Sequence, residues 1–201
     1  MKIALDTSQS SGSIALWDKG KTVWSACFDI RITHSETLMP QIDAAMKFCG
    51  YQPADIKTVL VTSGPGSFTG LRIGLATAKG IAYALKIPLL TYTSLQLYAL
   101  QRYHCSKNIL VMLDAKMQEV YAALYNENLE EIYPPQVSTL EDILSWEFGD
   151  CYLIERGIKS LELFSQEKNK PFISVPDLPV SAAGLFLLQE IFPQPEVYNL
   201  D

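Results

Sequence analysis

Residues 58–86 read TVLVTSGPGSFTGLRIGLATAKGIAYALK. An apolar run (58–62) leads through a glycine-rich loop into a long segment of small and apolar residues, which predicts a strand, a loop and a helix over 70–86. Only Arg72, Lys79 and Lys86 carry charge in that helix. Because a helix that is apolar all round is buried on more than one side, the segment is a candidate site for a ligand or a protein partner.

Small residues form two rows along this predicted helix. Gly70, Gly74, Ala78 and Ala82 are spaced by four, and Ala76, Gly80 and Ala84 form a second row. Each interior glycine costs about 1 kcal/mol relative to alanine, so the glycines need a reason. Small side chains let a neighbouring element approach closely. One row can face the protein's own sheet and the other a partner helix, but internal packing alone is equally compatible with the sequence.

The first block of the chain predicts a sheet with flanking helices. Three strands are expected, at 2–6, 13–17 and 22–28. A capping box formed by Thr33 and Glu36 precedes apolar residues at helical spacing, which predicts a helix ending at Gly50 with a bend or a shifted start at Pro40. A strand at 88–92 and a helix at 94–103 follow the glycine-rich segment.

The second block repeats the alternation of strands and helices. Strands are expected at 109–114, 120–125, 152–155 and 172–175, and helices at 139–146, 158–167 and 180–192. The first of these helices opens with Thr139 and Asp142 at the spacing of a capping box. The sequence therefore predicts an α/β fold with two lobes, an N-terminal lobe over 1–104 and a smaller lobe over 105–201, whose last helix packs back on the first lobe.

Composition excludes several classes of protein. The chain has 201 residues, a net charge of −6 and a pI of about 5.0, so its surface is not a general nucleic-acid footprint. The uncharged run from Ile87 to Gln101 is too short to cross a membrane. Because the chain opens directly on a strand, we expect no signal peptide, no membrane association and a cytoplasmic location. The four cysteines form no close pair, which excludes structural zinc by spacing, and we expect them to be buried free thiols.

Candidate chemical motifs are few. The glycine loop precedes a helix, the usual context for phosphate binding, but its spacing fits neither the dinucleotide fingerprint nor a P-loop. Asp6, Thr7 and Ser8 could hold hydrated magnesium and phosphates, or could satisfy the backbone of their own turn. His34 and His104 form no zinc-hydrolase motif, and no paired nucleophile and base is evident.

Several motifs together resemble one protein family. They are LDTS (5–8), SIAL (13–16), HSE (34–36), GPGSFTGLRIG (64–74), DAK (114–116) and EVY (119–121). In this combination the chain is similar to the bacterial TsaB family, with Lys116 where that family usually has arginine. The resemblance covers nearly the whole chain, although beyond about residue 126 it is mainly one of size and element order.

The resemblance implies a fold and a role. The fold would be that of the actin-like ATPases, which include sugar kinases and heat-shock chaperones, with a reduced second lobe and a degenerate phosphate loop at Asp6, Thr7 and Ser8. The role would be the synthesis of threonylcarbamoyladenosine in tRNAs that read codons beginning with A. In that system TsaD carries the metal histidines and transfers the group, TsaE is an ATPase, and TsaB is a catalytically inactive partner.

The resemblance also implies where partners bind. The family docks on TsaD through a four-helix bundle, here built from the helices at 34–49 and 70–86. The expected interface residues are Leu38, Ile42, Met46, Leu71, Arg72, Gly74, Leu75, Ala78, Ile81 and Ala82. We expect Arg72 to pair with a carboxylate or with the phosphate of a nucleotide bound at the interface. TsaE would join through TsaD, tRNA would be contacted only indirectly, and the isolated chain would form a homodimer through the same surface.

Two other functions remain open on the sequence. One is a small-molecule kinase or ATPase of the same fold, although the second lobe shows no recognisable second phosphate loop. The other is a metallopeptidase, which the missing metal ligands disfavour.

Overall fold

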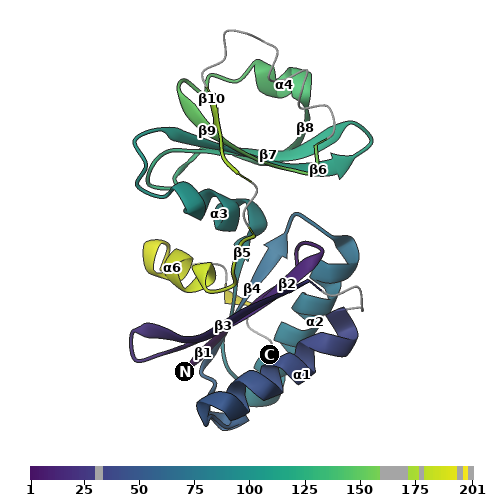
Figure 1. Cartoon of the computed structure of the whole chain (residues 1–201), viewed down its shortest axis with the longest axis vertical. Helices are drawn as coiled ribbons and strands as arrows, with labels where there is room; N and C mark the ends of the chain where they lie inside the picture. The colour runs from purple at the N-terminus through teal and green to yellow at the C-terminus, as the bar shows by residue number, and fades with distance from the viewer. Residues whose placement is uncertain (30–33, 159–171, 177–178, 194–196, 199–201) are drawn as a thin grey trace. The chain divides into compact units, whose positions relative to one another are not determined.

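The computed structural model describes residues 1–29, 34–158, 172–176, 179–193 and 197–198 (Figure 1). The chain divides into two compact units, one formed by Met1–Ser94 with Pro179–Asp201 and the other by Leu95–Leu178. The sequence places the boundary after residue 104, whereas the contacts of the chain assign Leu95 onward to the second unit and the C-terminal segment to the first.

The first unit is built on a six-stranded sheet in the order β11-β5-β4-β1-β2-β3. Its strands are β1 (Lys2–Asp6), β2 (Ser11–Asp18), β3 (Lys21–Asp29), β4 (Thr58–Gly64), β5 (Leu89–Thr93) and β11 (Val197–Tyr198). The first three are antiparallel, as the turn signals predict, and β4 and β5 extend the sheet in parallel with β1.

Helices cover this sheet, and α1 (His34–Cys49) and α2 (Phe68–Leu85) contact each other (Figure 1). Alternate strand residues such as Ile3, Leu5 and Val61 are fully buried in one cluster with apolar residues of both helices. A third helix, α6 (Gly184–Ile191), packs against β4 and places Phe186 5.3 Å from Trp17, ring centroid to ring centroid. The short helix η1 (Pro53–Asp55) leads into β4.

The second unit contains a five-stranded sheet in the order β10-β9-β6-β7-β8. Its strands are β6 (Asn108–Lys116), β7 (Glu119–Tyr125), β8 (Glu131–Thr139), β9 (Cys151–Arg156) and β10 (Phe172–Ser174). It also contains most of α3 (Ser94–Ala99), then η2 (Leu100–Arg102) and α4 (Leu140–Leu144). The capping box predicted for α4 is present, with Thr139 and Asp142 bonded reciprocally.

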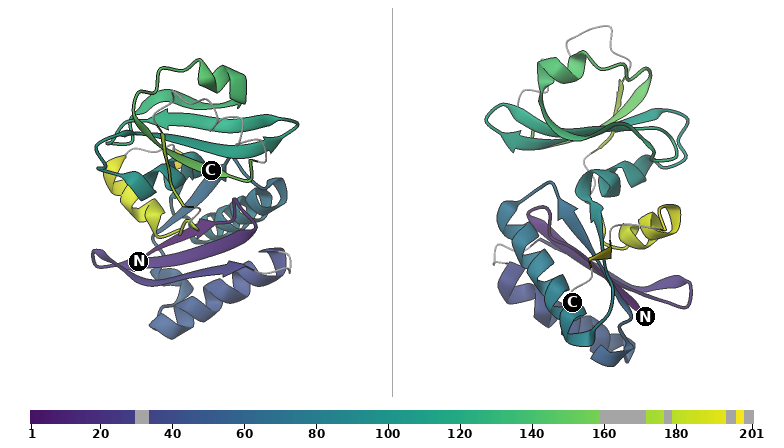
Figure 2. Two further views of the ribbon diagram at one scale, coloured as in Figure 1. Left: turned by 45° about the horizontal axis from the view of Figure 1, so that its top comes forward. Right: turned by 180° about the vertical axis from the view of Figure 1, so that it is seen from behind.

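Both units share one strand topology (Figure 2). The order β5-β4-β1-β2-β3 in the first unit corresponds to β10-β9-β6-β7-β8 in the second, with the same parallel and antiparallel pairs. Asp6 at the end of β1 therefore corresponds to Asp114 near the end of β6. The prediction of two related α/β lobes is confirmed at the level of sheet topology.

Some sequence predictions were wrong or lie outside the described residues. Strand β8 was not predicted because Pro134 and Pro135 lie within it, and prolines are tolerated on an edge strand such as this one. Helix α1 begins at His34 and runs through Pro40. The alternative of a shifted start is therefore wrong, and the alternative of a bend stays a prediction. The last helix begins at Gly184 rather than Val180. Thr33, the first residue of the expected capping box, and nearly all of the expected helix at 158–167 lie outside the described residues.

The cysteines only partly match the expectation of buried thiols. All four are free, and Cys151 is buried, so that desolvation raises the pKa of its thiol to about 12. Cys27, by contrast, is exposed on the edge strand β3. No helix within the described ranges is long and apolar enough to cross a membrane.

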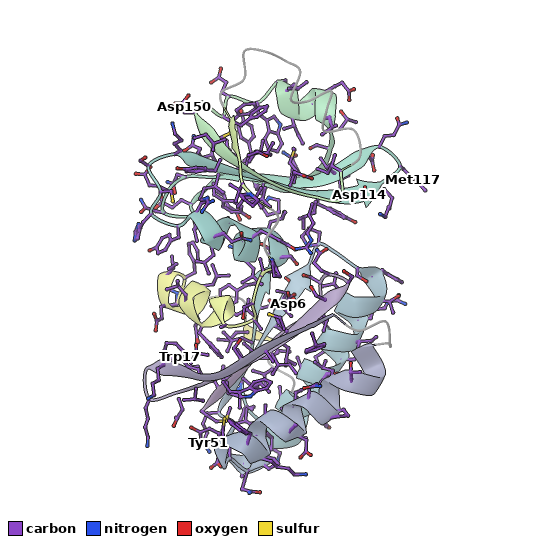
Figure 3. The ribbon with its side chains drawn as sticks, viewed as in Figure 1. Asp6, Trp17, Tyr51, Asp114, Met117 and Asp150 are labelled. Carbon is purple, nitrogen blue, oxygen red and sulfur yellow. The ribbon has the colours of Figure 1, made fainter. Side chains whose placement is uncertain are left out.

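The turn between β6 and β7 is strained. Lys116, Met117 and Gln118 all have positive φ, at 71°, 52° and 67°, although none is glycine. An L-residue in this region costs roughly 1–2 kcal/mol. The Asp114 carboxylate offsets part of this cost by accepting hydrogen bonds from both the backbone N and the Nζ of Lys116. The turn projects Met117 outward with 94% of its surface exposed (Figure 3).

The replacement Gln118→Gly should therefore stabilise the chain. Glycine adopts positive φ without a Cβ clash, so we expect the free energy of unfolding in urea to rise by about 0.5–1 kcal/mol. Gln118→Ala keeps the Cβ and serves as the control, with no gain expected. Equal stability of the two variants would show that φ at this position carries no strain.

Candidate partner-binding site

The first small row of α2 faces the interior of the first unit. Gly70, Gly74, Ala78 and Ala82 are the buried residues of the helix. A Cβ on Gly70 would collide with the backbone oxygen of Thr7, and a Cβ on Gly74 would collide with the Oγ1 of the same residue. Gly70 and Gly74 therefore have no room for a side chain, because Thr7 in the turn after β1 occupies the space.

The turn after β1 is closed by the chain itself. Asp6, Thr7 and Ser8 are at most 2% exposed, and Figure 3 labels Asp6. The Oδ1 of Asp6 accepts hydrogen bonds from Thr62 Oγ1 at 2.6 Å and from Ser8 N at 3.0 Å. Thr7 Oγ1 donates to Gly70 O at 2.7 Å, and Ser8 O accepts from Ser67 N at 2.7 Å. In this conformation Thr7 and Ser8 bind α2 and the glycine loop, and Asp6 binds β4. Among the described residues, the buried Oγ of Ser8 has no hydrogen-bond partner.

Six of the expected interface residues point inward rather than outward. Leu38, Ile42, Met46, Gly74, Ala78 and Ala82 are all buried. Their contacts are made within the first unit, where five of them belong to the apolar cluster between the sheet and the two helices. In the isolated chain these six residues are covered by their own unit, and their place in a partner interface stays a prediction. The helical spacing identified a buried face, and the sequence alone does not say what buries it.

The other expected residues differ in exposure. Leu71, Leu75 and Ile81 are half-buried, and the last two pack at the margin of the apolar cluster. Arg72 is exposed.

The outward side of α2 carries a continuous row at four-residue spacing, which we call the outer row. Its members are Phe68, Arg72, Ala76, Gly80 and Ala84, and every one of them is exposed. A Cβ built on Gly80 would meet nothing within 4 Å. The second small row of the sequence is thus the exposed one, and it extends toward the N-terminus of the helix through Arg72 and Phe68.

Large apolar side chains accompany the outer row. Phe68 is 67% exposed, and Tyr83, one turn before the end of α2, is 71% exposed. On the neighbouring helix α1, Met39 and Phe48 are exposed as well. Sequence reasoning missed Phe68 and Tyr83, although continuing the second small row back by four residues twice leads from Ala76 to Phe68.

The N-terminal end of the outer row holds an ordered cation. The guanidinium carbon of Arg72 lies 3.7 Å from the centroid of the Phe68 ring. Such stacking is favourable and leaves the edge of the guanidinium free to bind a carboxylate or phosphate. The helix also carries Lys79 and has no acidic residue, although the whole chain has a net charge of −6.

His104 belongs to no metal site among the described side chains. His104 follows η2 and stacks on Tyr103, with ring centroids 3.8 Å apart. Among the side chains that the structure describes, no three from His, Cys, Asp and Glu are grouped so that they could hold a metal ion.

Comparison with known proteins identifies the family. A family model described as TsaD, tRNA N6-adenosine threonylcarbamoyltransferase, matches residues 30–195. A tRNA threonylcarbamoyladenosine biosynthesis protein TsaB, from Bacillus subtilis (strain 168), is 34% identical over 145 residues, 71% of this chain and 63% of that protein. The chain belongs to the TsaB family. The TsaB protein of Escherichia coli (strain K12) is 31% identical over 65% of this chain and 57% of that protein. The matched region thus spans about three fifths of the length of these curated relatives.

Solved structures support the fold. YeaZ from Pseudomonas aeruginosa has a TM-score of 0.81 and 25% identity, covering 94% of this chain and 90% of that one. A polyphosphate/ATP-glucomannokinase from Arthrobacter sp. strain KM has a TM-score of 0.51 at 12% identity, covering 96% and 98%. The predicted fold class, an α/β actin-like ATPase fold of two lobes, is confirmed.

The two small rows of α2 should respond oppositely to alanine. Gly74→Ala places a Cβ against Thr7, so overpacking should lower the free energy of unfolding by about 1–3 kcal/mol. Gly80→Ala adds a Cβ in open space and should raise it by about 0.5–1 kcal/mol through helix propensity. Urea unfolding of the two variants measures both changes. Effects of the same sign would contradict the assignment of one row to the interior and the other to the surface.

Proposed function

We propose that this chain is a non-catalytic subunit that binds TsaD, and with it TsaE, and supports transfer of the threonylcarbamoyl group to adenosine in tRNAs reading codons that begin with A. One observation carries the proposal: α2 uses Gly70, Gly74, Ala78 and Ala82 for its own core and leaves a second row of small residues exposed. A helix needs one such row to pack on its sheet, so the second requires a separate explanation.

The chemistry of the outer row suits a helical partner. Ala76, Gly80 and Ala84 offer a shallow surface on which another helix can approach closely. Phe68 and Tyr83 lie near opposite ends of this surface and provide large apolar groups. Aromatic residues and arginine are the residue types that contribute most to binding at protein interfaces. Helix α1, with Met39 and Phe48 exposed, would supply the second helix of the bundle on this side.

Charge indicates the chemistry of the facing surface. Helix α2 carries Arg72 and Lys79 and no carboxylate, so a partner surface with acidic side chains would complement it. The chain as a whole is acidic, which supports a subunit that leaves contact with tRNA to other components. Without TsaD, we expect the same face to pair with a second copy of the chain.

Blocking the outer row should abolish association with TsaD. Gly80→Trp places a large side chain on the outer row without entering the core, since Gly80 has open space around it. We expect its affinity for TsaD, measured by calorimetry, to fall at least about 100-fold. Ala54→Trp is the control because Ala54 is also small and exposed, but it lies in η1 rather than on α1 or α2.

The same variants test the function directly. In a reconstituted tRNA modification assay with TsaD and TsaE, wild type and Ala54→Trp should support threonylcarbamoyladenosine formation. Gly80→Trp should not support it at concentrations where wild type is saturating. Full activity of a correctly folded Gly80→Trp variant, or modification that does not depend on the chain, would contradict the proposal.

Arg72 should contribute to TsaD binding through the planar, bidentate geometry of its guanidinium group. We expect Arg72→Ala to weaken TsaD binding about tenfold, with a smaller dependence of affinity on salt. Arg72→Lys keeps the charge but loses bidentate geometry and stacking on Phe68, so it should restore only part of the loss. Binding by Arg72→Lys as strong as wild type would show that only the charge matters. No effect of Arg72→Ala would remove the residue from the interface.

A further inference from the structure

We infer that Thr7 is a positioning residue that sets how α2 presents the outer row to its partner. This inference rests on the proposed function and assigns a role to a residue whose surface is only 1% exposed. The contacts of the turn after β1 carry the argument.

Thr7 contacts the helix at two successive turns. Its Oγ1 donates a hydrogen bond of 2.7 Å to Gly70 O, and the same oxygen occupies the position that a side chain on Gly74 would need. Its backbone oxygen occupies the corresponding position at Gly70. One residue therefore determines both the distance of α2 from β1 and the rotation of its first turns about the helix axis.

The neighbours of Thr7 hold it in place from both sides. Ser8 O accepts a hydrogen bond from Ser67 N, the residue that caps α2. On the other side, Asp6 Oδ1 accepts from Thr62 on β4 and from Ser8 N. This buried network joins two strands of the sheet to the start of the helix, so the start of α2 cannot shift without breaking it.

The Gly70 carbonyl that Thr7 binds lies next to the N-terminal end of the outer row. This end needs the most accurate placement because it carries Arg72. Gly70 lies in sequence between Phe68 and Arg72, whose stacked side chains form the N-terminal end of the outer row. Because the inner and outer rows belong to one helix, a rotation that loosens the contact of Gly70 with Thr7 also displaces the Arg72 guanidinium. Bidentate recognition of a carboxylate is sensitive to such a displacement.

The second unit contains a corresponding turn after β6. Its residues show that a turn of this kind does not require burial of the positions that follow the aspartate. Asp114 accepts a hydrogen bond from the backbone N of Lys116, as Asp6 does from Ser8. Yet Ala115 and Lys116, which correspond to Thr7 and Ser8, are half-buried and exposed respectively, whereas Thr7 and Ser8 are buried. The hydrogen bond from Thr7 to α2 needs a hydroxyl that Ala115 lacks, so the turn shared by the two units does not by itself require this bond.

Three replacements of Thr7 separate positioning from simple stability. Thr7→Val keeps the shape and removes the donor, Thr7→Ser keeps the donor, and Thr7→Cys supplies only a weak donor. For each folded variant we would measure the affinity for TsaD by calorimetry. Hydrogen exchange of the amides at 68–76 in the isolated chain would be measured alongside.

We expect Thr7→Val to bind TsaD about 3- to 10-fold more weakly than wild type and to exchange faster at 68–76, as the loss of one buried hydrogen bond implies. Thr7→Ser should bind within about twofold of wild type. If Thr7→Val does not fold, the comparison of the other two decides, with weaker binding by Thr7→Cys than by Thr7→Ser expected.

The outcomes are distinguishable. Failure of the wild-type chain to bind TsaD would overturn the proposed function, and the role of Thr7 with it. Wild-type binding together with equal binding by folded Thr7→Val, whether or not its exchange changes, would overturn only the positioning role. Equal binding by Thr7→Ser and Thr7→Cys would do the same where Thr7→Val does not fold.

Discussion

The contact between Thr7 and the glycines of α2 is the constraint on which the first unit depends. Gly70 and Gly74 have no room for a Cβ because Thr7 occupies that space. Close approach of the helix to the sheet buries one small row and turns the opposite row outward. The buried core of the unit and the exposed face of α2 therefore both follow from this one contact between the turn and the helix. The polar turn at Asp6, Thr7 and Ser8 serves this packing, since its hydrogen bonds run to Thr62, Ser67 and Gly70.

Much of the fold follows from local sequence signals. The apolar runs and turn residues predicted β1, β4 and β6, and the capping box at Thr139 predicted α4. Strand β8 could not be predicted in this way, because two prolines disfavour a strand unless it lies at an edge, and edge position is a property of the assembled sheet. The positive φ angles at 116–118 could not be predicted either, since the turn contains no glycine that would indicate them.

The candidate site shows where sequence reasoning ends. Two small rows were visible in α2, but their sequences are nearly equivalent, and only the position of Thr7 shows which row is internal. Leu38, Ile42 and Met46 have the spacing of a helical contact face, and that face packs on the sheet of the same unit. The sequence predicted Arg72 as an interface residue, and its side chain is exposed, whereas its stacking on Phe68 depends on the side-chain geometry of the folded helix.

Photocrosslinking to TsaD tests the central claim most directly. A benzoylphenylalanine in place of Tyr83 keeps an aromatic ring at an exposed position on α2, and the same group in place of Met117 marks an exposed position in the second unit. If the outward side of α2 is the docking face, irradiation of the complex should join TsaD to the chain from position 83 and not from position 117. Crosslinking from 117 alone would place TsaD elsewhere and contradict the account.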